Sequence, residues 1–324
     1  MDNTWTNVHN WVGLAVPGDV NATAGNTVNA DIATFNAPLL GGIGGAGNPI
    51  LPDDATVING RSRRVAGITF DTTNCGPYVI WSPSPAVITD GASTLTTGYL
   101  YVSHTGAIRI NDSVTNSQSV VIPLLVNLPS STAGSFNLVN NSTNPGVSLT
   151  INSITHAGAT TRATTFILDG TNSSVNVVTN LSEGPGNGTG GFTKQGTCSW
   201  IIAGPGTFPA GSPININNGT LIVQDPGAFG AVTTTAVVTN ATLRIDGVSL
   251  TTPTINLRNG GTILGKGIGM VNGVMYDQLT CKLAEGQHTV SADKPLGLSV
   301  YGYYNVGSYA FVGGSDVKII NPIL

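Results

Sequence analysis

The feature that most constrains the fold is a short motif that recurs in the second half of the chain. Residues 218–223 (NGTLIV), 240–245 (NATLRI) and 260–264 (GGTIL) share a threonine that follows turn-forming Gly or Asn residues. These threonines lie at positions 220, 242 and 262, so the spacing is 22 and then 20 residues. A period near 20 residues with several short strands predicts a solenoid, in which each turn of the chain stacks on the previous one.

Apolar residues elsewhere alternate with polar ones, as in strands. Residues 148–152 (SLTIN), 174–177 (SVNV) and 214–217 (ININ) show this period of two, whereas no window shows the spacing of an amphipathic helix. In the repeat, the residue after each threonine is expected to point into the core; these residues are Leu221, Leu243 and Ile263. The pattern predicts an all-β protein.

Composition agrees with a packed β protein and argues against nucleic acid as a partner. Charged residues make up only 9% of the 324 residues, but the hydrophobic fraction of 40% is too high for a disordered chain. The net charge is −4, and the twelve Lys and Arg residues form no basic stripe that would neutralise phosphates. We interpret the one basic cluster, Arg61, Arg63 and Arg64, as a solvated turn or a contact between subunits.

The cysteines do not form the pattern of a disulfide framework or a metal site. Cys75, Cys198 and Cys281 are odd in number and far apart. We expect buried free thiols, with one long-range disulfide and a spare thiol as the alternative. No metal site and no cofactor are predicted. No apolar segment approaches the roughly 20 residues that a membrane-spanning helix needs, so no membrane insertion is expected.

One segment resembles a known repeat family. Residues 191–202 (GFTKQGTCSWII) resemble the opening of the autotransporter-associated β-strand repeat, with its Gly-apolar-Thr-Lys-x-Gly start. Residues 211–223 and the turn at 227–230 (GAFG) are similar to the continuation of that repeat. Residues 4–35 and 64–71 (RVAGITFD) resemble other parts of such passenger proteins. Over most of residues 1–265, this resemblance implies a right-handed parallel β-helix.

The repeat pattern stops after residue 267, and the C-terminal part has a different sequence pattern. Strands are predicted at 277–282, 288–290 and 298–304. The stretches 286–290 (GQHTV) and 295–302 (PLGLSVYG) resemble the N-terminal-type module of IgGFc-binding-protein-like extracellular proteins, which implies a role at surfaces. We expect this part to be a small antiparallel β module that caps the solenoid, because an exposed last strand invites uncontrolled pairing.

These features divide the chain into three regions. Residues 1–54 are predicted to form an entry and capping segment, 55–267 the β-helix repeats, and 268–324 the C-terminal β module. The first residues lack the basic and apolar segments of a signal peptide, and no membrane anchor is recognised. A chain that starts at Met1 without either favours a virion component; otherwise the signal and the anchor lie outside this chain.

Catalytic residues are not expected. The two glutamates, Glu183 and Glu285, sit beside glycine, and we interpret them as turn residues. The same explanation applies to Asp53 and Asp54, which follow Pro52, and to four aspartates that adjoin Gly, Pro or Asn: Asp112, Asp169, Asp225 and Asp246. The histidines occur in unrelated contexts at His9, His104, His156 and His288, and there is no Gly-x-Ser-x-Gly motif. The chain is therefore predicted not to be an enzyme.

The expected function is a structural one. The first hypothesis is a subunit of an extracellular or virion assembly, of the fibre, decoration or tail type. The alternative is a secreted cell-surface adhesin of the passenger type, and the remote alternative is a β-helix enzyme that acts on polysaccharide. Expected partners are copies of this chain, other structural subunits or host surface glycans. Aromatic residues near both ends are candidates for an interface, or else for plugs of the core: Trp5, Trp11, Tyr301, Tyr303, Tyr304, Tyr309 and Phe311.

Overall fold

The computed structural model describes most of the chain between residues 31 and 278 and two later segments. The described residues are 5, 12, 15–18, 31–39, 44–47, 49–50, 64–81, 87–90, 93–96, 99–127, 133–157, 163–183, 188–230, 235–248, 250, 254–271, 274–278, 298–304 and 307–313. The chain forms two compact units, Met1–Thr280 and Cys281–Leu324.

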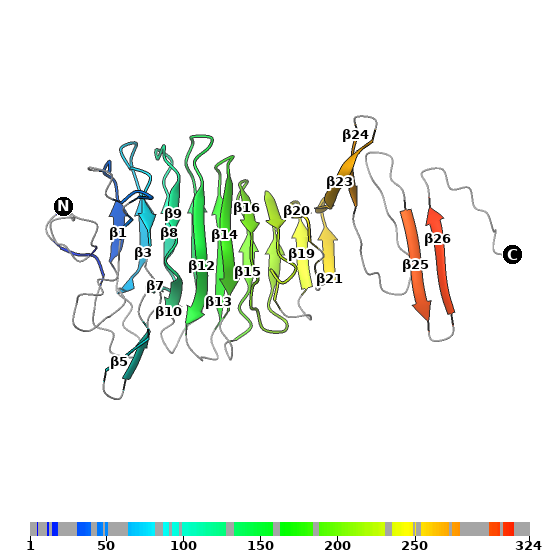
Figure 1. Ribbon diagram of the computed structural model, residues 1–324, viewed down its shortest axis with the longest axis horizontal. Helices are drawn as coiled ribbons and strands as arrows, with labels where there is room; N and C mark the ends of the chain where they lie inside the picture. Colours follow the sequence, from blue (N-terminus) through cyan, green and yellow to red (C-terminus); the bar gives the residue numbers. More distant parts are fainter. Residues whose placement is uncertain are drawn as a thin grey trace. The chain divides into compact units, whose positions relative to one another are not determined.

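The first unit is all-β, and its strands build two large parallel sheets (Figure 1). One sheet has nine strands, in the order β1 (Ile32–Phe35), β3 (Gly67–Phe70), β8 (Ala107–Ile110), β11 (Gly134–Asn140), β13 (Thr164–Gly170), β15 (Phe192–Lys194), β17 (Ile214–Ile216), β19 (Thr235–Thr239) and β21 (Thr254–Arg258). All of its neighbouring strands pair in parallel.

The other sheet has eleven strands. Its main path runs through β2 (Arg64–Val65), β7 (Leu100–Ser103), β10 (Leu124–Asn127), β12 (Leu149–Ala157), β14 (Val175–Ser182), β16 (Ser199–Ile202), β18 (Thr220–Val223), β20 (Thr242–Ile245) and β22 (Thr262–Leu264). Beside this path, β9 (Gln118–Val120) pairs with β12 and with β4 (Val79–Ile80). From β10 to β22, successive strands alternate between the two sheets, and each pairs with the strand two places later.

Within the described part of the chain, three antiparallel pairs lie outside the two large sheets, and only their backbone is described. They are β5 (Val87–Asp90) with β6 (Ser93–Thr96), β23 (Lys266–Val271) with β24 (Val274–Gln278), and β25 (Leu298–Tyr304) with β26 (Gly307–Gly313). Strand β25 confirms the predicted strand at 298–304. The predicted strand at 277–282 overlaps only the end of β24, and the one at 288–290 lies outside the described residues.

The register of the strands turns the sequence repeat into columns of like residues. Thr220 of β18 pairs with Thr242 of β20, which pairs with Thr262 of β22. The residues that follow them, Leu221, Leu243 and Ile263, form the next column. Leu221 and Leu243 are fully buried, and Ile263 is partly buried against the core. The predicted spacing and inward direction are therefore confirmed.

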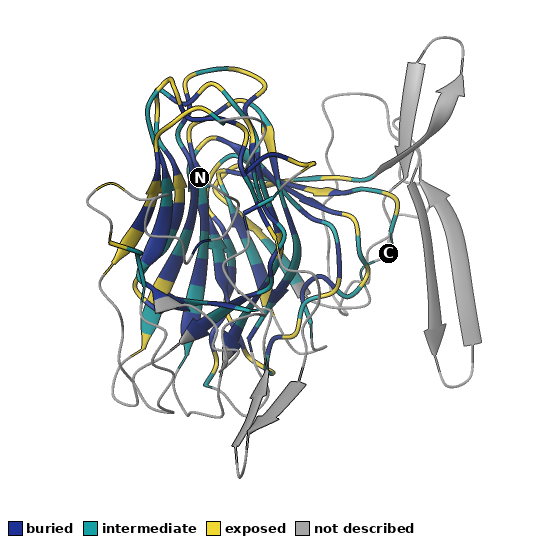
Figure 2. Cartoon of the chain, turned by 60° about the vertical axis from the view of Figure 1, so that its left-hand side comes forward, coloured by how far each residue is buried: buried dark blue, intermediate teal, exposed yellow. Residues whose placement is uncertain are grey.

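Buried and half-exposed positions alternate along most strands because successive side chains point to opposite faces of a sheet (Figure 2). In the nine-stranded sheet the buried column runs from Phe136 through Phe166 and Phe192 to Ile214. Phe192 also contacts two phenylalanines outside the strands, Phe208 and Phe229, with ring centroids 5.6 and 5.7 Å away. The buried apolar side chains between the sheets form one connected cluster.

A charge placed in this core tests the register. The change Leu243→Asp buries a carboxylate between Leu221 and Ile263, so we expect the free energy of unfolding to fall by at least about 3 kcal/mol. Arg244→Asp on the same strand is the matched control, because Arg244 points outward and is exposed; its effect should stay below about 1 kcal/mol. Urea denaturation followed by circular dichroism measures both, and equal effects would contradict the assigned faces.

Candidate functional site

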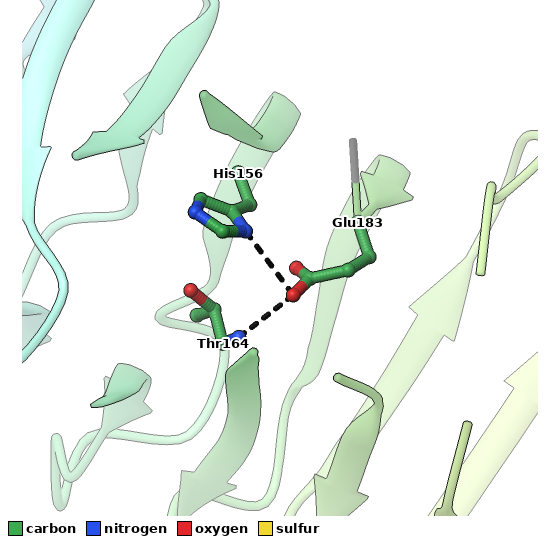
Figure 3. A network of polar contacts seen from close by, with 3 residues as sticks. All are labelled: His156, Thr164 and Glu183. Atoms are coloured by element: carbon green, nitrogen blue, oxygen red, sulfur yellow. Dashed lines mark hydrogen bonds and ion pairs between the residues drawn. The ribbon is translucent and has the colours of Figure 1, made fainter. Parts of the chain in front are cut away.

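The most unusual polar group in the first unit is a buried imidazole–carboxylate pair. His156 lies near the end of β12, and Glu183 directly follows β14. His156 Nδ1 is 3.1 Å from Glu183 Oε1, and both side chains are fully buried. The backbone N–H of Thr164, at the start of β13, donates to the same oxygen at 2.7 Å. Figure 3 shows both contacts converging on this one carboxylate oxygen.

The pair occupies a column that is otherwise apolar. His156 pairs in register with Val126 of β10, which pairs with Val102 of β7. On the other side, Glu183 donates its backbone N–H to the carbonyl of Thr207 at 2.6 Å, and the buried Phe208 follows. The interpretation of Glu183 as a turn residue is therefore wrong. Its side chain points inward and bonds the start of a strand in the nine-stranded sheet to the end of a strand in the eleven-stranded sheet.

The contact between His156 and Glu183 resembles the imidazole–carboxylate contact of a catalytic triad, but both side chains are buried. A carboxylate that contacts Nδ1 orients an imidazole and leaves Nε2 for chemistry. Among the described residues, His156 Nε2, Glu183 Oε2 and Thr164 Oγ1 have no hydrogen-bond partner. Because His156 and Glu183 are completely covered, a substrate does not reach them in this conformation. The arrangement joins the two sheets at a corner.

A second histidine lies close to the pair. His104 directly follows β7 and is also buried, with 7% of its surface exposed. Burial lowers the pKa of His104, and the nearby His156 lowers it further. The four histidines thus do not all occupy unrelated contexts, because the structure brings His104 and His156 into one polar cluster with Glu183. His9 and His288 lie outside the described residues.

Lys194, the lysine of the family-like motif, is buried and caged by carbonyl groups. Its Nζ donates to the backbone oxygens of Gln195 at 2.6 Å, Gly196 at 2.8 Å and Asn218 at 3.1 Å. The last contact joins the turn after β15 to the turn before β18. Burial lowers the pKa of Lys194, whereas the neighbouring Cys198 raises it. The lysine therefore holds together the turn between β15 and β16 and the turn between β17 and β18.

Two of the three cysteines are buried free thiols, as expected. Cys75 and Cys198 form no disulfide. Burial raises the pKa of the Cys75 thiol to about 11 and also raises that of Cys198. A thiol with a raised pKa is a weak nucleophile at neutral pH, so both cysteines act as core residues. Cys281 lies outside the described residues.

Asp225 serves a turn, as predicted, and its Oδ1 accepts the backbone N–H of Gly227 at 2.7 Å. Asp169 instead lies at the end of strand β13, where its Oδ1 accepts the backbone N–H of Gly170 at 2.7 Å. Among the described residues, no group of three or more His, Cys, Asp or Glu side chains is arranged to hold a metal ion. No helix in the described part of the chain is long and apolar enough to cross a membrane.

The candidate interface residues fall into two groups. Trp5 is 1% exposed, meets Phe35 edge-on at a centroid distance of 5.8 Å, and donates its indole N–H to the Pro17 carbonyl at 2.9 Å. It packs against the first strand of the nine-stranded sheet, as a plug of the core does. Trp11 lies outside the described residues.

For the C-terminal candidates only the backbone positions are described: Tyr301, Tyr303 and Tyr304 lie on β25, and Tyr309 and Phe311 on β26. The basic cluster at 61–64 also lies outside the described side chains.

The role of Lys194 can be tested by removing its charge and keeping its length. Lys194→Met leaves three carbonyl oxygens without their donor, so we expect the free energy of unfolding to fall by about 1–3 kcal/mol. Thr193→Val on the same strand is the matched control, because Thr193 points outward; its effect should be within about 0.5 kcal/mol. Chemical denaturation compares the two. A stable Lys194→Met variant would mean that water replaces the ammonium group at no cost.

Comparisons of the chain with known protein families, with curated proteins and with solved structures find no match. The resemblances to the autotransporter-associated repeat and to the IgGFc-binding-protein module therefore remain predictions. The function is inferred from the arrangement of the side chains described above.

Proposed function

We propose that the chain is a non-enzymatic structural subunit of an extracellular or virion assembly, built as a right-handed parallel β-helix. The alternation of strands between two parallel sheets supports the β-helix, because a chain that winds around one core visits each sheet once per turn. In such a protein the outward sheet faces act as contact surfaces, and the inward side chains serve the fold.

The observation that carries the proposal is an uncharged row on the outer face of the nine-stranded sheet. One column of paired residues crosses seven strands, from β8 to β21, and its side chains point outward. Every member of this column is half-exposed: Ala107, Asn137, Ile167, Thr193, Asn215, Val237 and Asn256. The centres of protein interfaces are depleted in charged residues because a charge is costly to remove from water. An uncharged row of Thr, Asn and aliphatic residues suits a broad subunit contact.

The polar core supports a structural role in a second way. The residues whose chemistry is most useful to an enzyme are turned inward, where they bond the backbone. Lys194 donates to three carbonyls, and Glu183 accepts a backbone N–H. Buried polar groups that are used in this way stabilise a defined stack.

The first experiment places a charge at the centre of the outer row. Asn215→Glu adds a half-exposed carboxylate to this uncharged row, so the fold should persist while self-association or binding to a partner subunit weakens by at least about tenfold. Asn217→Glu is the matched control, because Asn217 lies just beyond the same strand and is exposed. Sedimentation velocity over a range of concentrations measures association. Equal association of both variants and the unmodified chain would exclude this face as the contact.

The setting of the protein is tested in the organism that makes it. Immunogold electron microscopy with antibody against this chain should label virus particles or an extracellular assembly. Label spread over the cell surface would favour the adhesin hypothesis, and label confined to the cell interior would contradict both. A glycan panel incubated with the protein tests the enzyme hypothesis, since turnover that an Asp→Asn change abolishes would overturn the structural proposal.

A further inference from the structure

The turn between β17 and β18 contains an Asn–Gly pair whose peptide unit is contacted at both of its ends. The backbone N–H of Gly219 donates to Asn218 Oδ1 at 2.8 Å. The carbonyl oxygen of Asn218, which belongs to the same peptide unit, accepts a hydrogen bond from Lys194 Nζ at 3.1 Å. The side-chain amide of Asn218 therefore lies against the nitrogen of this unit, and the lysine lies against its oxygen.

The contacts of Lys194 indicate that its amine is charged. Nζ donates to the carbonyls of Gln195, Gly196 and Asn218. A neutral amine carries two hydrogens, whereas three donated bonds use the three hydrogens of an ammonium group. Burial lowers the pKa of Lys194, but carbonyl acceptors around the nitrogen favour the charged form. A full positive charge therefore rests on the Asn218 carbonyl.

The fold requires glycine at position 219. A Cβ atom there would lie 2.5 Å from the Cys198 oxygen, 2.6 Å from the Gly196 oxygen and 2.9 Å from Lys194 Nζ. Gly219 also has a φ of 64°, which glycine adopts at little cost. Because the residue lacks a side chain, its backbone nitrogen is not shielded from the amide of Asn218. The Asn218 side chain itself is exposed, so water reaches it.

This combination distinguishes the turn from the others of the repeat. The pairing of Thr220 with Thr242 gives the next turn Asn240 and Ala241 at the equivalent positions. One turn later, the position that corresponds to Lys194 is Ile216, which has no donor. A second described Asn–Gly pair, at residues 259–260, is exposed, and within the described part of the chain no cation donates to its first carbonyl.

We propose that Asn218 is a self-modification site, at which the folded turn converts the asparagine into aspartate and isoaspartate with the help of Lys194. The backbone nitrogen of Gly219 bonds to Asn218 Cγ, its proton passes to the side-chain amide nitrogen, and the Cγ–Nδ2 bond breaks to release ammonia. Water then opens the resulting cyclic imide at either carbonyl, which gives the two products. Water is the one further reactant, and no oxidation or reduction takes place.

The two contacts promote different parts of this reaction. The hydrogen bond between Gly219 N–H and Asn218 Oδ1 holds the nitrogen close to Cγ, because Cγ is bonded to that oxygen. As the nitrogen loses its proton, negative charge develops on the Asn218 oxygen, where the Lys194 ammonium group stabilises it. Both products carry a carboxylate at a position that is neutral in the sequence. The inference concerns the chemistry of the turn, so it does not depend on the proposed assembly.

The first test compares the folded chain with its own isolated segment. The intact protein and a synthetic peptide of residues 212–224 are incubated at neutral pH, and peptide mapping by mass spectrometry follows deamidation at Asn218. The peptide has the same neighbouring residues but lacks Lys194 and the fixed turn. Asn218 should convert at least about fivefold faster in the folded chain. Equal or slower conversion in the folded chain would overturn the proposal.

A variant then separates the charge of Lys194 from its effect on the rigidity of the turn. Lys194→Met should slow conversion of Asn218 by at least about fivefold, because the developing charge loses its partner. Thr193→Val is the matched control and should leave the rate unchanged. The pair at 259–260 is the internal standard in every sample. Circular dichroism checks that each variant is folded; if Lys194→Met does not fold, the peptide comparison decides. Faster conversion in folded Lys194→Met would show that the lysine only restrains the turn, and would overturn the proposal.

Discussion

Pairing between strands that are two places apart in sequence is the interaction on which the rest of the first unit depends. Parallel pairing from β10 to β22 satisfies the backbone of each strand through its neighbours in its own sheet. It also stacks equivalent positions, so that Leu221, Leu243 and Ile263 lie in one column. A chain with 9% charged residues can fold in this way because the columns of apolar side chains fill the core and few ion pairs are needed.

The places where the pairing ends explain the buried polar residues. Each strand stops at a turn, where backbone groups lose their partners from the ladder. Lys194 donates to three carbonyls, two in the turn after β15 and one in the turn before β18. Asn176, in a column between Leu149 and Trp200, accepts the backbone N–H of Leu149 at 2.9 Å. Glu183 does the same for Thr164. These residues carry charge or amide groups, yet their work is to complete the backbone hydrogen bonding of the stack.

The sequence misled at one particular place, the cluster of His156 and Glu183. Strict alternation from Leu149 and Ile151 makes Thr155 inward and His156 outward. In the structure the alternation shifts by one residue after Ile151, so that Ile154 and His156 are buried. The neighbouring strand shifts at the matching position, which turns Leu181 and Glu183 inward. A paired shift on two adjacent strands leaves no mark in either segment alone, because it is stabilised by the pairing between them.

The sequence by itself determined the all-β character, the repeat register at 220, 242 and 262, the inward leucines and the strand at 298–304. These follow from local alternation and from spacing along the chain, which the amino acids carry directly. Only the tertiary structure decided which polar residues share a corner. His104, His156 and Glu183 are separated by 52 and 27 positions, as their numbers show, and Thr164 reaches them from the other sheet. Their contacts depend on how far the chain travels in each turn of the stack, and that distance is set by the loops and the packing between sheets.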